Sequence, residues 1–373
     1  MKRYSKITLK NIAESLGISI STVSRVLAGK SEKYRISAKT AERVRLEAQR
    51  TGFHPNQIAS ALRLKRTHTI GLIIPDISNP FFAAIARQVE MEAAKRGYFI
   101  ILCDSRDSTD IEIEYIALLQ ARSVDGMIIS PVGTSGEHLI ALRNAGVPVV
   151  LVDRFFPDLP IPYVTSENRS GAFDAVTNLV NHGHRRIACV RGIFGSSTAD
   201  ERLHGYREAL KQHGISFDAK LVAGDDFSYD SGYTATKKLF STASSAPSAL
   251  FSQGILITFG ILKALEEMHI SIPEDVSIIS FDDHYYAAFL STPLTTVAQN
   301  KESIGEHAVK LLFRQFNRGV DKVTEGVLIP TTLVERNSVG TLQKTLKKFG
   351  RDKPSVSKRN RCQNKNKITN ERV

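Results

Sequence analysis

Cysteine is scarce in the 373-residue chain, and the cysteines that occur are placed unlike metal ligands. Cys103, Cys189 and Cys362 are far apart, whereas zinc-binding cysteines come in closely spaced pairs. Cys103 and Cys189 each lie in a short apolar segment that predicts a strand, where a thiol behaves as a small apolar group. We therefore expect no metal site, and buried, reduced thiols of the kind found in a reducing compartment.

Long apolar runs are also missing. No segment approaches the ~20 apolar residues that a helix needs to cross a bilayer. The basic start of the chain, residues 1–6, is not followed by the apolar core of a secretory signal. These absences predict a protein that has no membrane partner and stays in the cytoplasm.

Sequence motifs for catalysis are missing as well. Gly195-Ser196-Ser197 lacks the Lys-Ser/Thr pair that completes a phosphate-binding loop, and no serine lies in a nucleophile elbow. His182 and His184 flank a glycine just before an apolar segment, which fits a helix end and a strand start better than a metal or catalytic site. We therefore predict that the chain is not an enzyme and needs no cofactor.

Positive charge is plentiful but unevenly distributed. The net charge is +12, yet residues 1–66 hold 15 Lys/Arg against 4 Asp/Glu, and residues 341–373 hold 11 against 2. The segment between them therefore carries a net charge of −8. A basic head on an acidic body suits a protein of which only the head lies on the phosphates of a nucleic acid.

The head contains two short predicted helices joined by a tight turn. Ile12 and Leu16 share one face of the first helix, Gly17 suits the left-handed residue that ends a helix, and Ser19 can cap the second. This arrangement is a helix-turn-helix. Its second helix turns outward side chains that can enter a DNA major groove, namely Ile20, Ser21, Thr22, Ser24 and Arg25.

Beyond the head, predicted strands and helices alternate in two successive series. Apolar strands such as 70–74, 126–130 and 147–152 alternate with helices such as 81–96, and a second series begins near residue 171. Near-continuous apolar strands are typical of parallel sheets covered by helices on both faces. We therefore predict an all-α helix-turn-helix domain followed by a two-lobed α/β core.

Three groups of residues occur in a specific order: Thr22-Val23-Ser24-Arg25-Val26-Leu27, then Pro55-Asn56-Gln57-Ile58-Ala59, then Ile70-Gly71-Leu72-Ile73-Ile74-Pro75 with Asn79-Pro80-Phe81-Phe82. In this combination the sequence resembles the lactose-repressor (LacI/GalR) family of bacterial transcription regulators. The resemblance implies a periplasmic-binding-protein-like core, a homodimer on palindromic double-stranded operator DNA, a location at the nucleoid, and a small effector, a sugar or sugar derivative, between the lobes.

The resemblance also implies how the chain divides. We expect a helix-turn-helix domain at 1–54, a hinge helix and linker at 55–68, an effector-binding and dimerisation domain at 69–340, and a disordered basic tail at 341–373. Residues 295–325 are expected to return from the second lobe to the first.

The DNA-contacting residues expected in the head are those of the second helix together with Thr8, and the hinge adds others. In the hinge, Leu62 matches the residue that wedges into the minor groove, and Asn56, Ala59 and Arg63 accompany it. The chain departs from the family in having Asn11 in place of an acid and Ala28 in place of an asparagine.

The effector site is expected at the carboxyl ends of the strands, where carboxylates and aromatic rings can receive the hydroxyls and faces of a sugar. The candidates that follow strands are Asp76, Asn79, Phe81, Phe82, Asp153 and Asp282, and the resemblance implies Thr198, Arg202, Phe227 and Gln299 in addition. After the strand 249–252 the family usually has Asn-Asp, but this chain reads Gln253-Gly254-Ile255, which favours a larger or differently shaped ligand.

Three other interpretations use the same residues. A periplasmic sugar receptor shares the two-lobed core. It would carry a secretory signal, which this chain lacks, and it would not carry the helix-turn-helix and hinge of residues 1–66. An enzyme on this scaffold lacks a catalytic constellation. A regulator controlled by a protein partner instead of a sugar stays open because of Gly254 and Ile255.

Overall fold

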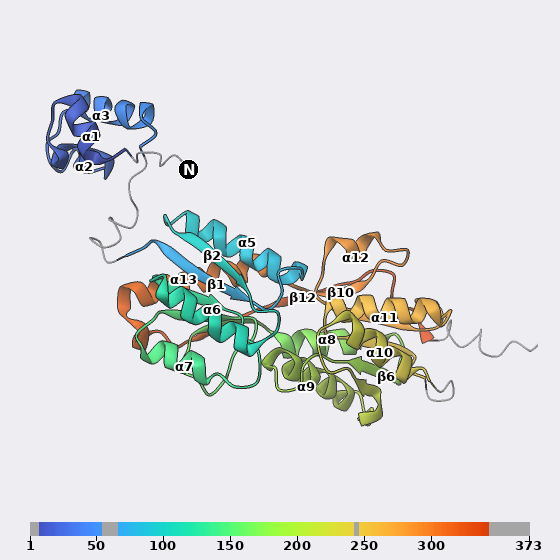
Figure 1. The fold of residues 1–373 in the computed structure, drawn as a ribbon. Coiled ribbons are helices and arrows are strands. Elements are labelled where there is room, and N and C mark those ends of the chain that lie inside the picture. The colour runs from blue at the N-terminus through green and yellow to red at the C-terminus, as the bar shows by residue number, and fades with distance from the viewer. Residues whose placement is uncertain (1–6, 54–65, 242–245, 343–373) are drawn as a thin grey trace, which may run out of the picture.

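The computed structural model describes residues 7–53, 66–241 and 246–342 (Figure 1). The first range forms three helices, α1 (Leu9–Leu16), α2 (Ile20–Leu27) and α3 (Ala38–Arg50). Gly17, with φ +66°, ends α1, and the Ser19 hydroxyl accepts a hydrogen bond from the backbone N–H of Thr22 to begin α2. The buried side chains of Ile12, Val23 and Val44 hold the three helices together, which confirms the predicted helix-turn-helix.

The rest of the described chain forms two lobes, each built on a six-stranded sheet. Across the first sheet the strands lie in the order β11 (Gly326–Ile329), β5 (Tyr163–Ser166), β4 (Val149–Val152), β3 (Gly126–Ile129), β1 (Thr69–Ile74) and β2 (Phe99–Asp104). Every pairing in this sheet is parallel. Helices α5 (Pro80–Ala94) and α13 (Lys301–Arg318) pack on one face, and α6 (Thr109–Ala121) and α7 (Glu137–Asn144) on the other.

The second sheet repeats this plan. Its strands lie in the order β12 (Thr331–Val334), β10 (Thr295–Gln299), β9 (Ser277–Phe281), β8 (Ala249–Ser252), β6 (Ile187–Val190) and β7 (Val222–Ala223), and only the β10–β12 pairing is antiparallel among the pairs described. Helices α8 (Asn168–Asn181) and α9 (Ser197–Gln212) cover one face, and α10 (Tyr229–Leu239) and α11 (Ile255–Glu267) the other, with the short α12 (Tyr285–Phe289) beyond β9 (Figure 1). Single 3₁₀ turns lie at Ala219–Leu221 and Val320–Lys322.

The chain passes between the lobes at three places, after β5, after β10 and after β11. The prediction that residues 295–325 return to the first lobe is therefore wrong for 295–299, which form β10 of the second sheet. It is right for α13, whose Ile304, Val309 and Leu312 pack on the first sheet. Strand pairing decided this boundary, because apolar strands of both sheets look alike in sequence.

Some local predictions are confirmed. Cys103 and Cys189 are buried, unpaired thiols. His182 caps the end of α8, and His184 is buried between the Ser248 hydroxyl and the Gly340 carbonyl, so both have structural roles. In the part of the chain that the structure describes, no helix is both long and apolar enough to cross a membrane.

Candidate nucleic-acid interface and interlobe cavity

The outward face of α2 borders a hollow of about 420 Å³ on the surface of the helix-turn-helix. Four of the predicted DNA-contacting residues line it: Ile20, Ser21, Ser24 and Arg25. The sequence interpretation missed four others that the tertiary structure adds, namely Leu9, Ala28, Lys30 and Tyr34. Lys30 and Tyr34 belong to the loop after α2. Only the three-dimensional structure shows that this loop folds back beside the outward face of the helix.

Arg25 is held by this loop. Its guanidinium carbon lies 4.1 Å from the centre of the Tyr34 ring, a distance typical of a cation–π contact. The loop is closed by backbone hydrogen bonds from Lys30 N–H to the Arg25 carbonyl and from Tyr34 N–H to the Lys30 carbonyl. Arg25 is exposed, so its charge faces solvent while its plane is oriented by the ring.

Two of the predicted DNA contacts have other partners here. The Thr8 hydroxyl accepts from the Asn11 N–H (3.3 Å) and Asn11 Oδ1 accepts from the Thr8 N–H (2.9 Å), which makes these residues a capping box for α1. The Thr22 hydroxyl lies 2.9 Å from that of Ser19. Asn11, which stands where the family carries an acid, thus keeps the capping function without a negative charge. The predicted hinge residues Asn56, Ala59, Leu62 and Arg63 lie outside the described residues.

A cavity lies between the two lobes at the carboxyl ends of the strands. All ten predicted effector residues line it: Asp76, Asn79, Phe81, Phe82, Asp153, Thr198, Arg202, Phe227, Asp282 and Gln299. Three further residues, Asp107, Arg154 and Leu256, were missed. Asp107 and Arg154 lie three and two residues after β2 and β4, so the same strand-end rule could have found them.

On the first-lobe side, Asp153 is the least satisfied group. Its carboxylate is almost fully buried, and its Oδ1 has no hydrogen-bond partner. Burial raises the pKa of the Asp153 carboxyl from 3.8 to about 6, against the opposing effect of Arg202 and Arg154. The backbone there is left-handed (φ +63°), which aspartate tolerates better than most residues and which places the carboxylate beside the cavity.

Arg154 is the cation of the same side. Its Nη1 donates to Asp107 Oδ1 at 2.9 Å, whereas its buried Nε has no partner. The guanidinium also lies 5.3 Å from the centre of the Phe227 ring of the second lobe. Asp153 and Arg154 therefore present one unsatisfied acceptor and one unsatisfied donor to the cavity.

On the second-lobe side Arg202 and Asp282 are already paired, whereas Gln299 Oε1 is buried without a hydrogen-bond partner. The buried Arg202 donates from Nε to Asn168 Oδ1 (2.8 Å) and from Nη1 to the Gln253 carbonyl, and its guanidinium stacks 3.7 Å from the centre of the Phe281 ring. Burial lowers the pKa of this guanidinium below its usual value, partly offset by Asp282 and Asp153. Asp282, also left-handed (φ +74°), accepts a hydrogen bond from the Gln299 amide.

The arrangement can bind a polar ligand but does not suggest catalysis. Carboxylates and guanidinium groups can receive hydroxyls, and the three phenylalanine rings can cover apolar faces. The cavity is narrow, because the volume open to the centre of a water-sized molecule is about 40 Å³. Among the described residues, no group of three or more histidine, cysteine, aspartate or glutamate side chains could hold a metal ion.

Comparisons with known proteins match both parts of this architecture. A family model described as bacterial regulatory proteins, lacI family, matches residues 8–56, and one described as a periplasmic binding protein-like domain matches residues 176–339. The HTH-type transcriptional regulator DegA of Bacillus subtilis (strain 168) is 33% identical over 341 residues, which cover 90% of this chain and 99% of that protein. The chain belongs to the LacI family.

Solved structures of LacI-family proteins agree with this assignment. The chain is similar to the transcriptional regulator CelR in its cellobiose complex, with a TM-score of 0.67 and 30% identity over 89% of this chain and 99% of that one. It is also similar to the lac repressor dimer bound to operator and the anti-inducer ONPF, with a TM-score of 0.80 and 26% identity over 90% and 100% of the two chains. The chain is therefore a DNA-binding transcription regulator of this family.

The family departure after β8 has a structural explanation in this LacI-family chain. The buried Gln253 side chain accepts from the Gly192 N–H and donates to the Ala199 carbonyl, so it braces the loops around α9. Gly254 begins α11, and a Cβ added there would lie 3.3 Å from the Phe227 ring and 3.8 Å from the Asp282 carboxylate. The missing side chain thus lets the Phe227 ring pack close to the start of α11.

Proposed function

We propose that this LacI-family protein is a repressor that binds a two-fold symmetric operator as a homodimer and responds to a sugar or sugar derivative in the interlobe cavity. The observation that carries the ligand part is the convergence of all ten expected residues on one cavity with unpaired polar atoms. Asp153 Oδ1, Arg154 Nε and Gln299 Oε1 are buried without hydrogen-bond partners, and such atoms are stabilised when a ligand supplies the missing partner.

The homodimer is supported by exposed apolar side chains at one edge of the first lobe. Phe99 and Leu102 of the edge strand β2 and Met91 of α5 are exposed, with Phe99 64% accessible. Monomeric proteins rarely leave several large apolar side chains together on an edge strand. A second copy of the chain would cover them and would bring two helix-turn-helix domains to two half-sites.

The small volume of the cavity links ligand binding to lobe movement. About 40 Å³ is room for little more than a water molecule, so a sugar ring requires the lobes or their side chains to move apart. A ligand that binds a different lobe arrangement better than this one shifts the population of the two. Because the first lobe carries both one wall of the cavity and the proposed dimer edge, this shift provides a route from effector to DNA.

Two experiments test the proposal. Selection from randomised DNA should yield a sequence with two-fold symmetry, and calorimetric titration with a panel of mono- and disaccharides should show saturable binding that Arg202→Lys weakens. An enriched sequence without symmetry would overturn the dimeric operator. A panel that produces no heat would instead favour control by a protein partner.

A further inference from the structure

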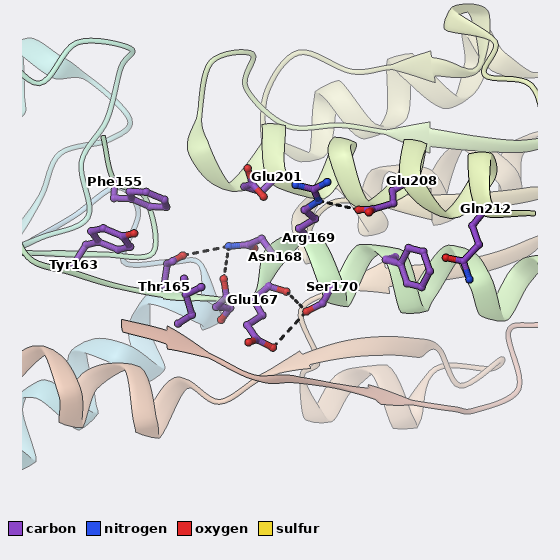
Figure 2. A pocket seen from close by; sticks show the side chains of 13 residues that line it. Phe155, Tyr163, Thr165, Glu167, Asn168, Arg169, Ser170, Glu201, Glu208 and Gln212 are labelled. Atoms are coloured by element: carbon purple, nitrogen blue, oxygen red, sulfur yellow. Dashed lines mark hydrogen bonds and ion pairs between the residues drawn. The ribbon is translucent and has the colours of Figure 1, made fainter. Parts of the chain in front are cut away.

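A second, larger pocket lies where the chain first crosses from one lobe to the other. We call it the crossover pocket; it is formed by β5, the first turn of α8, the facing side of α9 and the edge strand β11 (Figure 2). Its volume is about 540 Å³ by the measure that gives 40 Å³ for the interlobe cavity, which is within the range of small-molecule sites. None of the ten expected effector residues lines it.

One end of the crossover pocket is a wall of two stacked rings. The Phe155 and Tyr163 rings are nearly parallel (7°) with their centres 3.9 Å apart, and both are half-buried (Figure 2). Gly326 of the neighbouring strand makes this possible, because an added Cβ would lie 2.2 Å from the Tyr163 ring. The pocket therefore has an aromatic wall at one end.

The charged residues of the pocket are mainly acidic. Glu167, Glu201 and Glu208 line it, against a single arginine, Arg169, whose Nε donates to Glu208 at 2.8 Å. Figure 2 shows Glu167 and Glu201 between the stacked rings and the Arg169–Glu208 pair. Glu201 also attracts Arg169 and lies 3.6 Å from the exposed His204, and Glu167 accepts a hydrogen bond from the Ser170 hydroxyl, so the pocket still holds three carboxylates against one arginine.

A buried polar atom adds an independent sign of an absent partner. Ser166 lines the pocket with only 2% of its surface exposed, and its Oγ has no hydrogen-bond partner. A hydroxyl buried in this way is usually paired, because leaving it unpaired costs about 1–3 kcal/mol. A ligand polar group at this position would satisfy it.

We propose that the crossover pocket is a second ligand site that binds a small organic cation with a flat apolar portion. The flat portion packs on the Tyr163–Phe155 wall, where the ring faces also attract positive charge. The cationic group lies between Glu167 and Glu201 and gains their attraction, which is stronger here than in bulk water because the site is partly enclosed.

The crossover pocket is connected to the interlobe cavity by hydrogen bonds. Asn168 donates from Nδ2 to Thr165 Oγ1 (3.2 Å) on the pocket side and accepts from Arg202 on the cavity side. Thr165 Oγ1 in turn donates to the Asp153 carbonyl (2.6 Å). If the interlobe cavity holds the effector, as proposed above, a cation in the crossover pocket changes the affinity for that effector through this network.

Calorimetry on the full-length protein tests the site with 2-phenylethylammonium, and with 2-phenylethanol and 3-phenylpropanoate as neutral and anionic probes of the same shape. We expect the cation to bind with a dissociation constant of about 1 mM or below and the neutral probe about fivefold more weakly. Glu201→Gln should weaken binding of the cation about three- to fivefold, and Tyr163→Leu should weaken binding of all three probes, since each carries a ring. Glu274→Gln, an exposed residue outside the pocket, is the charge-matched control and should change nothing.

Any of three results would contradict the proposed site. They are equal binding of the three probes, no heat with the cation at about 20 mM, and the same effect from Glu201→Gln and Glu274→Gln. These measurements need neither DNA nor sugar, so they stand even if the proposed regulatory function fails. A bound cation that leaves the affinity for a sugar effector unchanged would overturn only the coupling through Asn168.

Discussion

The outward face of α2 and the interlobe cavity both gather residues expected to bind a ligand, but they are assembled differently. The α2 residues, from Ile20 to Arg25, lie within six consecutive positions, are mostly exposed, and carry positive charge towards solvent. The cavity residues come from positions 76 to 299 of the chain, include four aspartates, and are largely buried among paired and unpaired polar groups.

The difference predicts how each region responds to change. An exposed side chain can be removed without leaving an unpaired partner, so its loss affects binding and little else. A buried charged side chain holds its neighbours, so its loss affects stability as well as binding. Substitutions on the outward face of α2 should therefore change binding alone, whereas substitutions in the interlobe cavity should change both binding and stability.

Arg202→Ala should have the largest effect. It leaves the side-chain oxygen of Asn168 (Oδ1) and the backbone carbonyl of Gln253 without their donor. It also removes the buried cation beside Asp153. We expect the free energy of unfolding to fall by about 3–5 kcal/mol, with ligand binding lost. Urea denaturation and calorimetry measure both, and Arg202→Lys, which keeps the charge, should lose less stability. A stability loss below about 1 kcal/mol would contradict the structural role.

Asp153→Asn should have the next largest effect, and it should depend on pH. The folded-state pKa of about 6 exceeds the ordinary 3.8, so between these values the folded protein binds more protons than the unfolded one. The contribution of this group to stability therefore falls as pH rises from 3.8 through 6. At pH 7.5 the variant should be more stable than the parent by up to about 3 kcal/mol, and this difference should shrink below pH 5.

Urea denaturation of both proteins at pH 5 and pH 7.5 checks the Asp153 prediction. Asp158→Asn, on an exposed loop, is the matched control and should show no difference between the two pH values. If the difference in unfolding free energy between the parent and Asp153→Asn does not change with pH, burial does not disfavour the charged form of Asp153.

Arg25→Ala should weaken operator binding without affecting stability. We expect a loss of about 1–3 kcal/mol in binding free energy if the guanidinium reads a base, measured by gel shift at fixed salt. Urea denaturation should show no change, because Arg25 is exposed. Arg45→Ala removes the same charge from an exposed position of α3 and should cost less and relax no base preference. Equal losses from the two variants would leave Arg25 with a purely electrostatic role.

Tyr34→Ala should have the smallest effect, about 0.5–1 kcal/mol in operator affinity, because it removes only the ring that orients Arg25. Tyr34→Phe keeps the ring and should bind like the parent. In the Arg25→Ala background, Tyr34→Ala should have no further effect, which a double-mutant cycle in a gel-shift assay measures. Additive losses would mean that Tyr34 contacts DNA by itself.

The fold could be predicted where local pattern determines it. The strands Ile187–Val190 and Ala249–Ser252 and the capped helices α1 and α2 follow from apolar runs and capping residues close by in sequence. Strand β5 and the short helix α12 were missed, since four or five residues carry too little periodicity. The assignment of residues 295–299 to a lobe failed, because it depends on which distant strand they pair with.

The sequence by itself determined the helix-turn-helix, the alternation of strands and helices, and the six cavity residues that follow strand ends, because capping, periodicity and the strand-end rule act over a few residues. The other four expected residues, Thr198, Arg202, Phe227 and Gln299, came from the resemblance to the family. Only the tertiary structure decided that Tyr34 orients Arg25, that Arg202 is held by Asn168 and Gln253, and that the stacked rings form a second pocket. These contacts join residues far apart in the chain, and their energies depend on burial, which arises only when the lobes pack.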